Sequence, residues 1–296
     1  MATIINHDAV ITQNIDGFLP SSYNLDVVRL DLCHPIVSGN KWFKLSGILE
    51  DYHAQNKKYL ISFGGGWSNH LVALAYYTKC FQIPSKAFIR GHYEELTPSL
   101  QYVQAQGVEL IFLDRAAYDQ LKNNPDAIAT IYPEAYYVPE GGNSSIGVEG
   151  AQEIAKFLKN TYDYVCVSVG SGTTFAGLRR ALPAATHLLG FVPMKQGAYL
   201  GKEIASYLPD VDLSTYTLID TYHFGGFGKC TPELIAFMNT FYKSYAIPLD
   251  RVYTAKMMMG IRDMVQLAQI SSSKSIAAIH TGGLQGNQSI NAELVF

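Results

Sequence analysis

A glycine-rich turn in the middle of the chain has the layout of a phosphate-binding loop. In VCVSVGSGTTFAGLRR (165–180), an apolar run leads into glycines, and a helix is expected to begin near Thr174. Backbone N–H groups of such a turn, together with the N-terminal dipole of the helix, attract a phosphate. The loop residues in question are Gly170, Ser171, Gly172, Thr173 and Thr174. Taken alone, the segment fits an ordinary tight turn equally well.

Signatures of nucleotide binding do not accompany this loop. The pattern GxxxxGK[ST] is absent. Gly170, Gly172 and Gly177 do not form GxGxxG either, because the interval between Gly172 and Gly177 is too long. A phosphorylated cofactor is the next possibility, and pyridoxal 5'-phosphate requires in addition a lysine with a lowered pKa.

Lys41 and Lys44 are the candidate lysines, and both lie in HPIVSGNKWFKL (34–45). The residues from Ser38 to Asn40 resemble a helix N-cap region, which puts Lys41 in the first helical turn. The positive potential of a helix start favours the neutral amine there. Lys44 has the alternative role of a solvent-facing or structural lysine. The motif alone does not choose between the two.

Strand-length apolar runs alternate with helix-length stretches, which predicts an α/β protein with largely parallel sheets. The expected strands are 27–32, 58–63, 86–90, 108–113, 136–138, 164–169, 187–192 and 275–280. Ligands of open parallel sheets bind beyond the carboxyl ends of the strands. Four of these strands are followed by loops of Gly, Ser, Thr and Asn, namely 64–70, 141–145, 170–174 and 281–286.

Composition excludes several classes of protein. The 296 residues are 48% hydrophobic and 16% charged, the net charge is -3, and no basic cluster suits nucleic acid. The four cysteines form no CxxC, so neither a metal site nor a disulfide framework is indicated. No apolar run approaches the ~20 residues of a membrane helix, and the first residues lack a signal-peptide pattern. We therefore expect a cytoplasmic enzyme without a membrane or nucleic-acid partner.

The ordered motifs resemble one known family. LDLCHPIVSGNKWFKL (30–45) and ISFGGGWSNH (61–70) are similar to the opening of the 1-aminocyclopropane-1-carboxylate (ACC) deaminase and D-cysteine desulfhydrase family. Four similar blocks follow in the family's order: 138–150, 169–177, 252–261 and 279–283. The resemblance covers almost the whole chain and implies the fold-type-II, tryptophan synthase β-like architecture of pyridoxal-phosphate enzymes.

That architecture has two open α/β domains with the cofactor between them. We expect a large domain of residues 1–43 and 141–296 and a small inserted domain of residues 44–140. Because members of this fold type are commonly dimers, a homodimer is expected.

The resemblance implies roles for individual residues. Lys41, in the GNK motif, would carry the cofactor as a Schiff base, and the GSGTT loop would bind its phosphate. Asn69 would hydrogen-bond the ring hydroxyl of the cofactor. Ser68 would lie near the substrate carboxylate or act on the substrate, although it could simply complete a polar turn. Tyr253 would lie close to the substrate as an acid, base or electrostatic partner.

Further residues of the expected substrate site are less distinctive. His70 follows Asn69, and His280 precedes Thr281, but a histidine at a strand end is more often structural. Gln285 and Asn287 are polar substrate contacts or merely loop residues. Phe227, in HFGGFGKCTPE (223–233), stands where deaminases of the family usually have tyrosine.

Thr254 marks the main departure from the deaminase pattern, which has a glutamate at this place to pair with the pyridine nitrogen. A hydroxyl near that nitrogen, from Thr254 or from Thr281, would make the ring a weaker electron sink. Such a ring suits removal of an α-proton and expulsion of a β-substituent.

Three functions remain open at this point. The favoured one is a lyase of D-cysteine desulfhydrase type that releases ammonia and a 2-keto acid from a small amino acid. The second is ring opening of ACC to 2-oxobutanoate and ammonia. The third is a binder of pyridoxal phosphate or of another phosphorylated ligand without catalysis.

Overall fold

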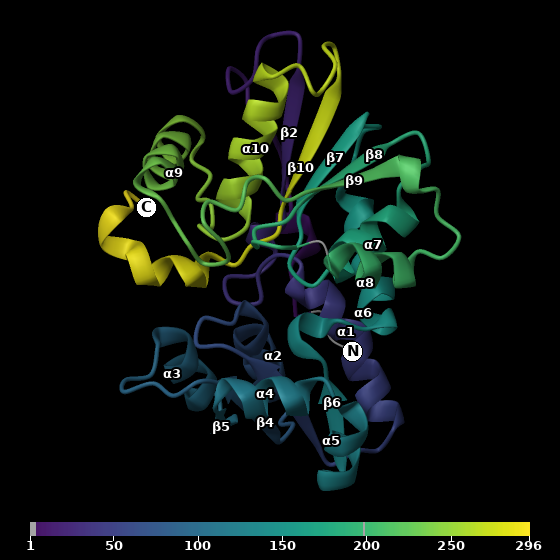
Figure 1. Ribbon diagram of the computed structural model, residues 1–296, viewed down its shortest axis with the longest axis vertical. Helices are drawn as coiled ribbons and strands as arrows, with labels where there is room; N and C mark the ends of the chain where they lie inside the picture. Colours follow the sequence, from purple (N-terminus) through teal and green to yellow (C-terminus); the bar gives the residue numbers. More distant parts are fainter. Residues whose placement is uncertain (1–3, 198) are drawn as a thin grey trace.

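Two separate β-sheets form the framework of the protein. The computed structural model describes residues 4–197 and 199–296. A six-stranded sheet has the order β1-β2-β10-β7-β8-β9, and a four-stranded sheet has the order β5-β4-β3-β6. Figure 1 shows the larger sheet in the upper half of the molecule and the smaller one below it.

The large sheet combines the two ends of the chain. Its strands are β1 (Thr12–Asn14), β2 (Asn24–Arg29), β7 (Tyr164–Ser168), β8 (His187–Phe191), β9 (Tyr216–Ile219) and β10 (Ser275–His280). All neighbours pair in parallel except β1, which runs antiparallel at one edge. Most residues of β2, β7, β8 and β10 are buried, which explains their continuous apolar runs.

The small sheet is parallel throughout and contains only neighbouring segments of the chain. Its strands are β3 (Tyr59–Gly64), β4 (Ser85–Arg90), β5 (Glu109–Leu113) and β6 (Ala135–Val138). The fold is therefore α/β with two sheets, as predicted.

Helices cover both sheets and connect their strands. They are α1 (Lys41–Ala54), α2 (Asn69–Cys80), α3 (Pro98–Ala105), α4 (Arg115–Lys122), α5 (Pro125–Ile131), α6 (Ser145–Gln152), α7 (Thr173–Ala181), α8 (Tyr199–Tyr207), α9 (Pro232–Tyr245) and α10 (Thr254–Gln266). No helix in the described ranges is long and apolar enough to cross a membrane.

Helix α1 packs closely against α6. A β-carbon on Gly150 would lie 1.9 Å from the carbonyl oxygen of Phe43, so only glycine permits this approach. Leu45, Ile48 and Leu49 of α1 share a core cluster with residues of both sheets. Helix α1 thus links the two sheets, and the boundary expected after residue 43 stays a prediction.

The strand predictions were wrong in some details. The expected strand 27–32 is observed as β2 (Asn24–Arg29), and residues Leu30–Cys33 form a 3-10 turn. Leu30 and Cys33 are buried in that turn, so their apolar character mimicked a continuing strand. The short edge strands β1 and β9 were not predicted, because their half-exposed residues lack an apolar run.

Candidate functional site

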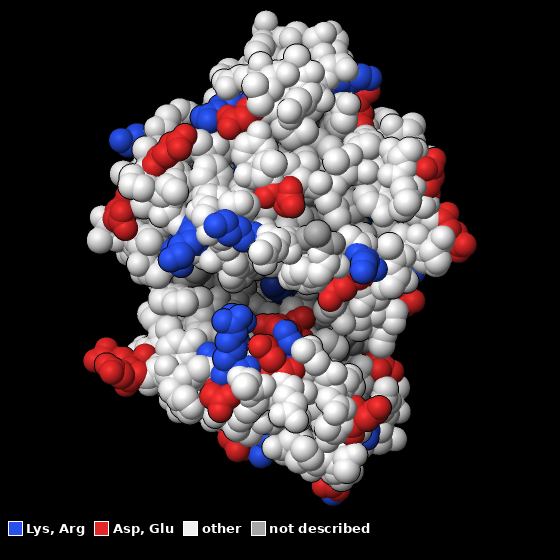
Figure 2. All heavy atoms as spheres, viewed as in Figure 1, with Lys and Arg blue, Asp and Glu red and all other residues white. Residues whose placement is uncertain are grey.

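A cavity of about 770 Å³ is lined by the loops that follow β3, β7 and β10. These loops leave the carboxyl ends of parallel strands in two different sheets, where ligands of such sheets bind. Figure 2 shows a hollow between the upper and lower halves of the molecule, with Lys and Arg side chains near its rim.

Most of the residues singled out from the sequence line this one cavity. They are Lys41, Ser68, Asn69, His70, Gly170, Ser171, Gly172, Thr174, Phe227, Tyr253 and Thr281. Within the glycine-rich loop, Thr173 is the exception: its side chain is fully buried and its hydroxyl donates to Oδ1 of Asn143 at 3.0 Å. Only its backbone N–H, at the start of α7, is left for a ligand.

Lys41 is the first residue of α1, and its amine faces the cavity. Its Nζ donates to Oδ1 of Asn40 at 2.6 Å, and Nδ2 of Asn40 donates to Oγ1 of Thr174 at 2.8 Å. Burial lowers the pKa of Lys41 to about 8, although the charge of Asp250 opposes the shift. The unprotonated amine, which is the nucleophilic form, is therefore much more populated near neutral pH than in an ordinary lysine, although the ammonium form still predominates.

Lys44 lies one turn further along α1 and is not solvent-facing. Its side chain is 4% exposed, and Nζ donates to Oγ of Ser171 and to the carbonyl oxygen of Gly141, both at 3.2 Å. Burial and the neighbouring charge of Lys41 hold the pKa of Lys44 well below its usual range. The second lysine therefore points at the glycine-rich loop.

The glycine-rich loop is built as the sequence predicted. Gly172 caps α7 with a φ of 80°, and a β-carbon there would lie 2.7 Å from Cγ1 of Ile204. Both the backbone conformation and the lack of space require glycine at this position. The helix begins at Thr173, so its first N–H groups open toward the cavity wall.

The loop after β3 brings three polar residues to the opposite wall. Ser68 caps α2, and its Oγ accepts from the N–H of Leu71 at 3.2 Å, so the hydroxyl hydrogen can still donate to a ligand. Nδ2 of Asn69 donates to the carbonyl oxygen of Gly283 at 3.3 Å, whereas Oδ1 is buried without a partner.

His70 is neutral, and its tautomer follows from its neighbour. Burial and the charges of Lys41 and Lys44 lower its pKa to about 3. Nε2 lies 2.8 Å from Oγ of Ser62, which already donates its hydrogen to the carbonyl oxygen of Val138. Nε2 must therefore carry the ring hydrogen, which leaves Nδ1 as a buried acceptor without a partner.

Tyr253 and Phe227 form an aromatic side of the cavity. Their rings meet edge to face with centroids 5.8 Å apart, and the ring of Tyr253 lies against Gly170. Burial, with the charge of Asp250 adding to it, raises the pKa of Tyr253, so its hydroxyl keeps its proton. The tyrosine is therefore suited to donate rather than to act as a base at neutral pH.

The loop that carries Phe227 is held by a buried lysine. Nζ of Lys256, on α10, donates to the carbonyl oxygens of His223 and Gly226 at 3.0 and 2.9 Å. Burial lowers the pKa of Lys256 to about 8. Phe227 itself is 53% exposed, so these hydrogen bonds help to fix its place beside Tyr253.

A buried carboxylate that the sequence reasoning missed also lines the cavity. Oδ1 of Asp250 accepts from the N–H groups of Tyr253 and Thr254, at 2.6 and 3.1 Å, and Oδ2 accepts from Val252 at 3.1 Å. Burial raises the pKa of Asp250, and these N–H donors oppose the rise. The sequence does offer a signal for this residue. An aspartate just before a helix can accept hydrogen bonds from the free N–H groups at the helix start, here at Thr254.

Thr254 does not line the cavity. It is fully buried, and its hydroxyl accepts from the N–H of Asp250 at 2.7 Å. Thr281 does line the cavity. Of the two threonines considered for the pyridine nitrogen, only Thr281 can reach a ligand there.

Residues 24–282 match the family described as pyridoxal-phosphate dependent enzymes. The chain belongs to this family. It is 26% identical over 284 residues to a Thermotoga maritima protein provisionally named a 1-aminocyclopropane-1-carboxylate deaminase, which covers 89% of this chain and 90% of the relative. It is 25% identical over 312 residues to the bifunctional D-cysteine desulfhydrase/1-aminocyclopropane-1-carboxylate deaminase of Arabidopsis thaliana. That match covers 92% of this chain and 75% of the relative.

The crystal structure of an ACC deaminase homologue matches with a TM-score of 0.83 and 25% identity, covering 96% of this chain and 94% of the homologue. The resemblance to this family of fold-type-II enzymes, the fold class and the cofactor are thereby confirmed.

The described residues fit a pyridoxal-phosphate ligand. Seven buried side-chain polar atoms in the described chain lack a hydrogen-bond partner. Four of them belong to residues of this cavity, namely Asn69, His70, Ser168 and Arg251. Buried polar atoms in folded proteins nearly always have a hydrogen-bond partner. The concentration of unpaired atoms in this cavity therefore indicates that a polar ligand binds here.

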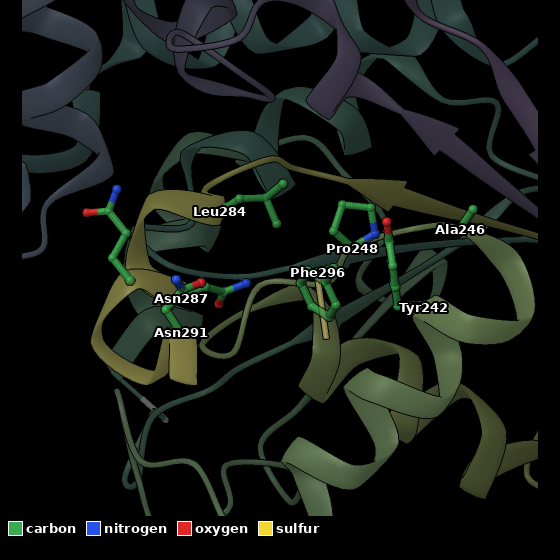
Figure 3. A pocket seen from close by; sticks show the side chains of 8 residues that line it. Tyr242, Ala246, Pro248, Leu284, Asn287, Asn291 and Phe296 are labelled. Carbon is green, nitrogen blue, oxygen red and sulfur yellow. The ribbon is translucent and has the colours of Figure 1, made fainter. Parts of the chain in front are cut away.

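Three polar residues for which a structural role was the alternative do not line this cavity. Nε2 of His280 lies 2.7 Å from the carbonyl oxygen of Pro248, and its Nδ1 accepts from Gly282, which makes this histidine structural. Gln285 donates to Ile36. Asn287 lines a separate cavity of about 380 Å³ beside α9 (Figure 3), and it bonds the backbones of Leu249 and Arg251.

Proposed function

We propose that this enzyme is a lyase that removes a β-substituent from a small amino acid and releases ammonia and a 2-keto acid, as a D-cysteine desulfhydrase does. The observation that carries the proposal is that Lys41 lines the cavity while Lys44 bonds the glycine-rich loop. In addition, residue 254 is a buried threonine rather than a glutamate, and the hydroxyl of Thr281 lines the cavity instead.

The cofactor would be held at both of its ends. Lys41, with its pKa of about 8, is the amine that binds it covalently. Nζ of Lys44, Oγ of Ser171 and the N–H groups at the start of α7 would hold the phosphate. When bound, the cofactor withdraws electrons from the α-carbon of an amino acid and acidifies its α-proton.

The substrate would lie between α2 and the aromatic side of the cavity. The hydroxyl of Ser68 and the N–H groups at the start of α2 would bind the α-carboxylate. Asn69, through Nδ2, would hold the ring hydroxyl of the cofactor. Nδ1 of His70 would accept a hydrogen bond from the ligand, since it has no partner in the protein. Nζ of Lys41 would move the α-proton, and Tyr253 would donate to the departing β-substituent.

The hydroxyl of Thr281 is the reason that elimination is preferred to ring opening. A strained ring without an α-hydrogen needs a stronger electron sink than α-proton removal does. Asp250 is a carboxylate close to Tyr253, but its oxygens accept three backbone N–H groups. ACC deamination is the second candidate, because both activities appear in the name of the Arabidopsis relative.

An assay of keto acid and ammonia over D- and L-amino acids and ACC tests this proposal. D-cysteine is expected to yield pyruvate, sulfide and ammonia, with ACC turned over more slowly. Lys41→Ala should abolish both turnover and the visible absorption of lysine-bound cofactor, whereas Lys156→Ala, at an exposed site on the surface, should change neither. Retained visible absorption in Lys41→Ala would contradict the assignment, and cofactor binding without product would favour a non-catalytic binder. A homodimer in the cytoplasm stays a prediction.

A further inference from the structure

The wall of the catalytic cavity carries two cationic side chains that the proposed chemistry does not use. The charged residues that line it are Lys41, Lys44, Arg90, Lys122, Glu140, Glu203, Asp250 and Arg251. The first two lysines are assigned to the cofactor. Lys122 pairs with Glu140 at 3.1 Å, and Asp250 is bonded to backbone N–H groups. Arg90 and Arg251 remain.

Glu203 does not serve as the partner of either arginine. Burial raises its pKa, and the charge that opposes this shift is that of Lys122. Within residues 4–197 and 199–296, no carboxylate lies within ion-pair distance of Arg90 or Arg251. Both arginines thus line the cavity without an ion-pair partner among the described residues; Arg90 is exposed at its rim, whereas Arg251 is partly buried.

Arg251 is the more constrained of the two. It lies between Asp250 and Tyr253 in the chain, and its backbone N–H donates to Oδ1 of Asn287 at 3.0 Å, which fixes the base of the side chain. Its Nε is buried and has no hydrogen-bond partner. A buried donor on a charged group is costly unless a ligand satisfies it.

Arg90 approaches from the small sheet, at the end of β4. A β-carbon built on Gly65 would lie 3.9 Å from its Nη2, so the guanidinium adjoins the loop that leads to Ser68. The group also lies over the ring of Tyr118, 5.9 Å from the centroid. Contact with an aromatic face leaves the N–H edge of a guanidinium free to bind an anion.

We propose that the preferred substrate carries a second carboxylate at the end of its side chain, bound by Arg251 and Arg90. This inference rests on the proposed function and narrows its substrate class to acidic amino acids. Guanidinium groups match carboxylates geometrically through paired N–H donors. A neutral side chain would leave Nε of Arg251 buried and unpaired.

A matched pair of substrates tests the proposal by turnover. Serine and 3-hydroxyaspartate have the same β-hydroxyl leaving group and differ by one carboxylate. In each, the Cα–H and Cβ–O bonds break and water departs. A second water then hydrolyses the resulting imine to ammonia and the keto acid, pyruvate or oxaloacetate. We expect kcat/KM to be at least tenfold higher for 3-hydroxyaspartate, in at least one of its stereoisomers.

Binding of non-eliminating ligands gives a readout that does not depend on turnover. Aspartate and asparagine, in both configurations, are titrated into the holoenzyme and followed by the spectrum of the bound cofactor. Aspartate should bind at least tenfold more tightly. Arg251→Met and Arg90→Met should each reduce this preference several-fold without weakening asparagine, and Arg251→Lys should retain part of it. Arg115→Met, at an 85% exposed site on α4, is the matched control.

Equal affinity for aspartate and asparagine in the wild-type enzyme would overturn the proposal. So would a preference that survives both arginine-to-methionine substitutions. If Arg251→Met does not fold, the preference for aspartate over asparagine can still be measured in Arg90→Met and Arg251→Lys. Failure of the proposed function is recognised separately, because it would appear as missing keto acid from D-cysteine or missing lysine-bound cofactor.

Discussion

Replacing Lys44 by methionine tests whether this lysine holds the phosphate of the cofactor. Nζ lies 3.2 Å from Oγ of Ser171, inside the glycine-rich loop, and the side chain is 4% exposed. A hydrogen bond to a charged group contributes about 1.5–3 kcal/mol, and 1.4 kcal/mol corresponds to a factor of ten. Lys44→Met is therefore expected to weaken binding of a phosphate-bearing ligand by about 10- to 150-fold.

The assay uses two ligands that cannot react with Lys41. Pyridoxine 5'-phosphate has the phosphate but no aldehyde, and pyridoxine lacks both groups. Lys44→Met should weaken only the phosphorylated ligand. Lys256→Met, which also removes a buried lysine, is the control and should leave both affinities unchanged. Methionine keeps the length of the apolar stem, so the close contact with Gly142 is preserved.

The pH dependence of the same binding gives an independent check. Burial holds the pKa of Lys44 well below its usual range, so its amine loses a proton at lower pH than an exposed lysine does. A phosphate favours the ammonium, so binding takes up a proton and the affinity should fall as the pH rises. This pH dependence of the affinity should be absent in Lys44→Met. An unchanged affinity for pyridoxine 5'-phosphate, or an equal loss for pyridoxine, would refute the assignment.

Four further substitutions separate structural from catalytic roles. Lys256→Met should lower the free energy of unfolding by about 1–3 kcal/mol and raise KM more than it lowers kcat, because it frees the loop of Phe227. Thr254→Val should lower the free energy of unfolding by about 1–3 kcal/mol, since the N–H of Asp250 loses its acceptor, but leave the cofactor spectrum unchanged. Thr281→Val should shift that spectrum. Tyr253→Phe should keep the spectrum and lower turnover about 100-fold or more.

Each of these expectations has a contrary result. A spectral shift in Thr254→Val rather than in Thr281→Val would reverse the choice of threonine. Wild-type turnover in Tyr253→Phe would remove the tyrosine from the chemistry, and an unchanged KM in Lys256→Met would show that the loop does not position the substrate. Melting curves and steady-state kinetics measure all of these changes.

Loops at strand ends were the part of the site that sequence could predict. In parallel sheets the carboxyl ends of strands converge, so SNH (68–70), GSGTT (170–174) and Thr281 are expected to meet, and all of these residues except Thr173 line one cavity. The glycine pattern could also be interpreted, because a left-handed φ at Gly172 has a distinctive residue preference.

The direction of a long side chain could not be predicted in the same way. Lys44 could lie on either side of α1, and only packing against α6 and the 141–142 turn directs it to Ser171. Arg90 and Arg251 occur in segments without a motif, so nothing in their spacing indicates that they face one cavity. Such placements depend on tertiary contacts between distant segments, which local periodicity does not encode.

Asp250 is a charge of the cavity that no motif indicates. Position 254 carries a threonine where deaminases of the family have a glutamate, so the motif alone predicts no carboxylate in this segment. The structure places a different carboxylate four residues earlier, where it stabilises the start of α10. Its charge also raises the pKa of Lys41, against the dominant effect of burial, and adds to the rise in the pKa of Tyr253. Asp250 thus adds to the effect of burial in keeping Tyr253 protonated and partly offsets the effect of burial on Lys41, so its position influences both groups through its charge.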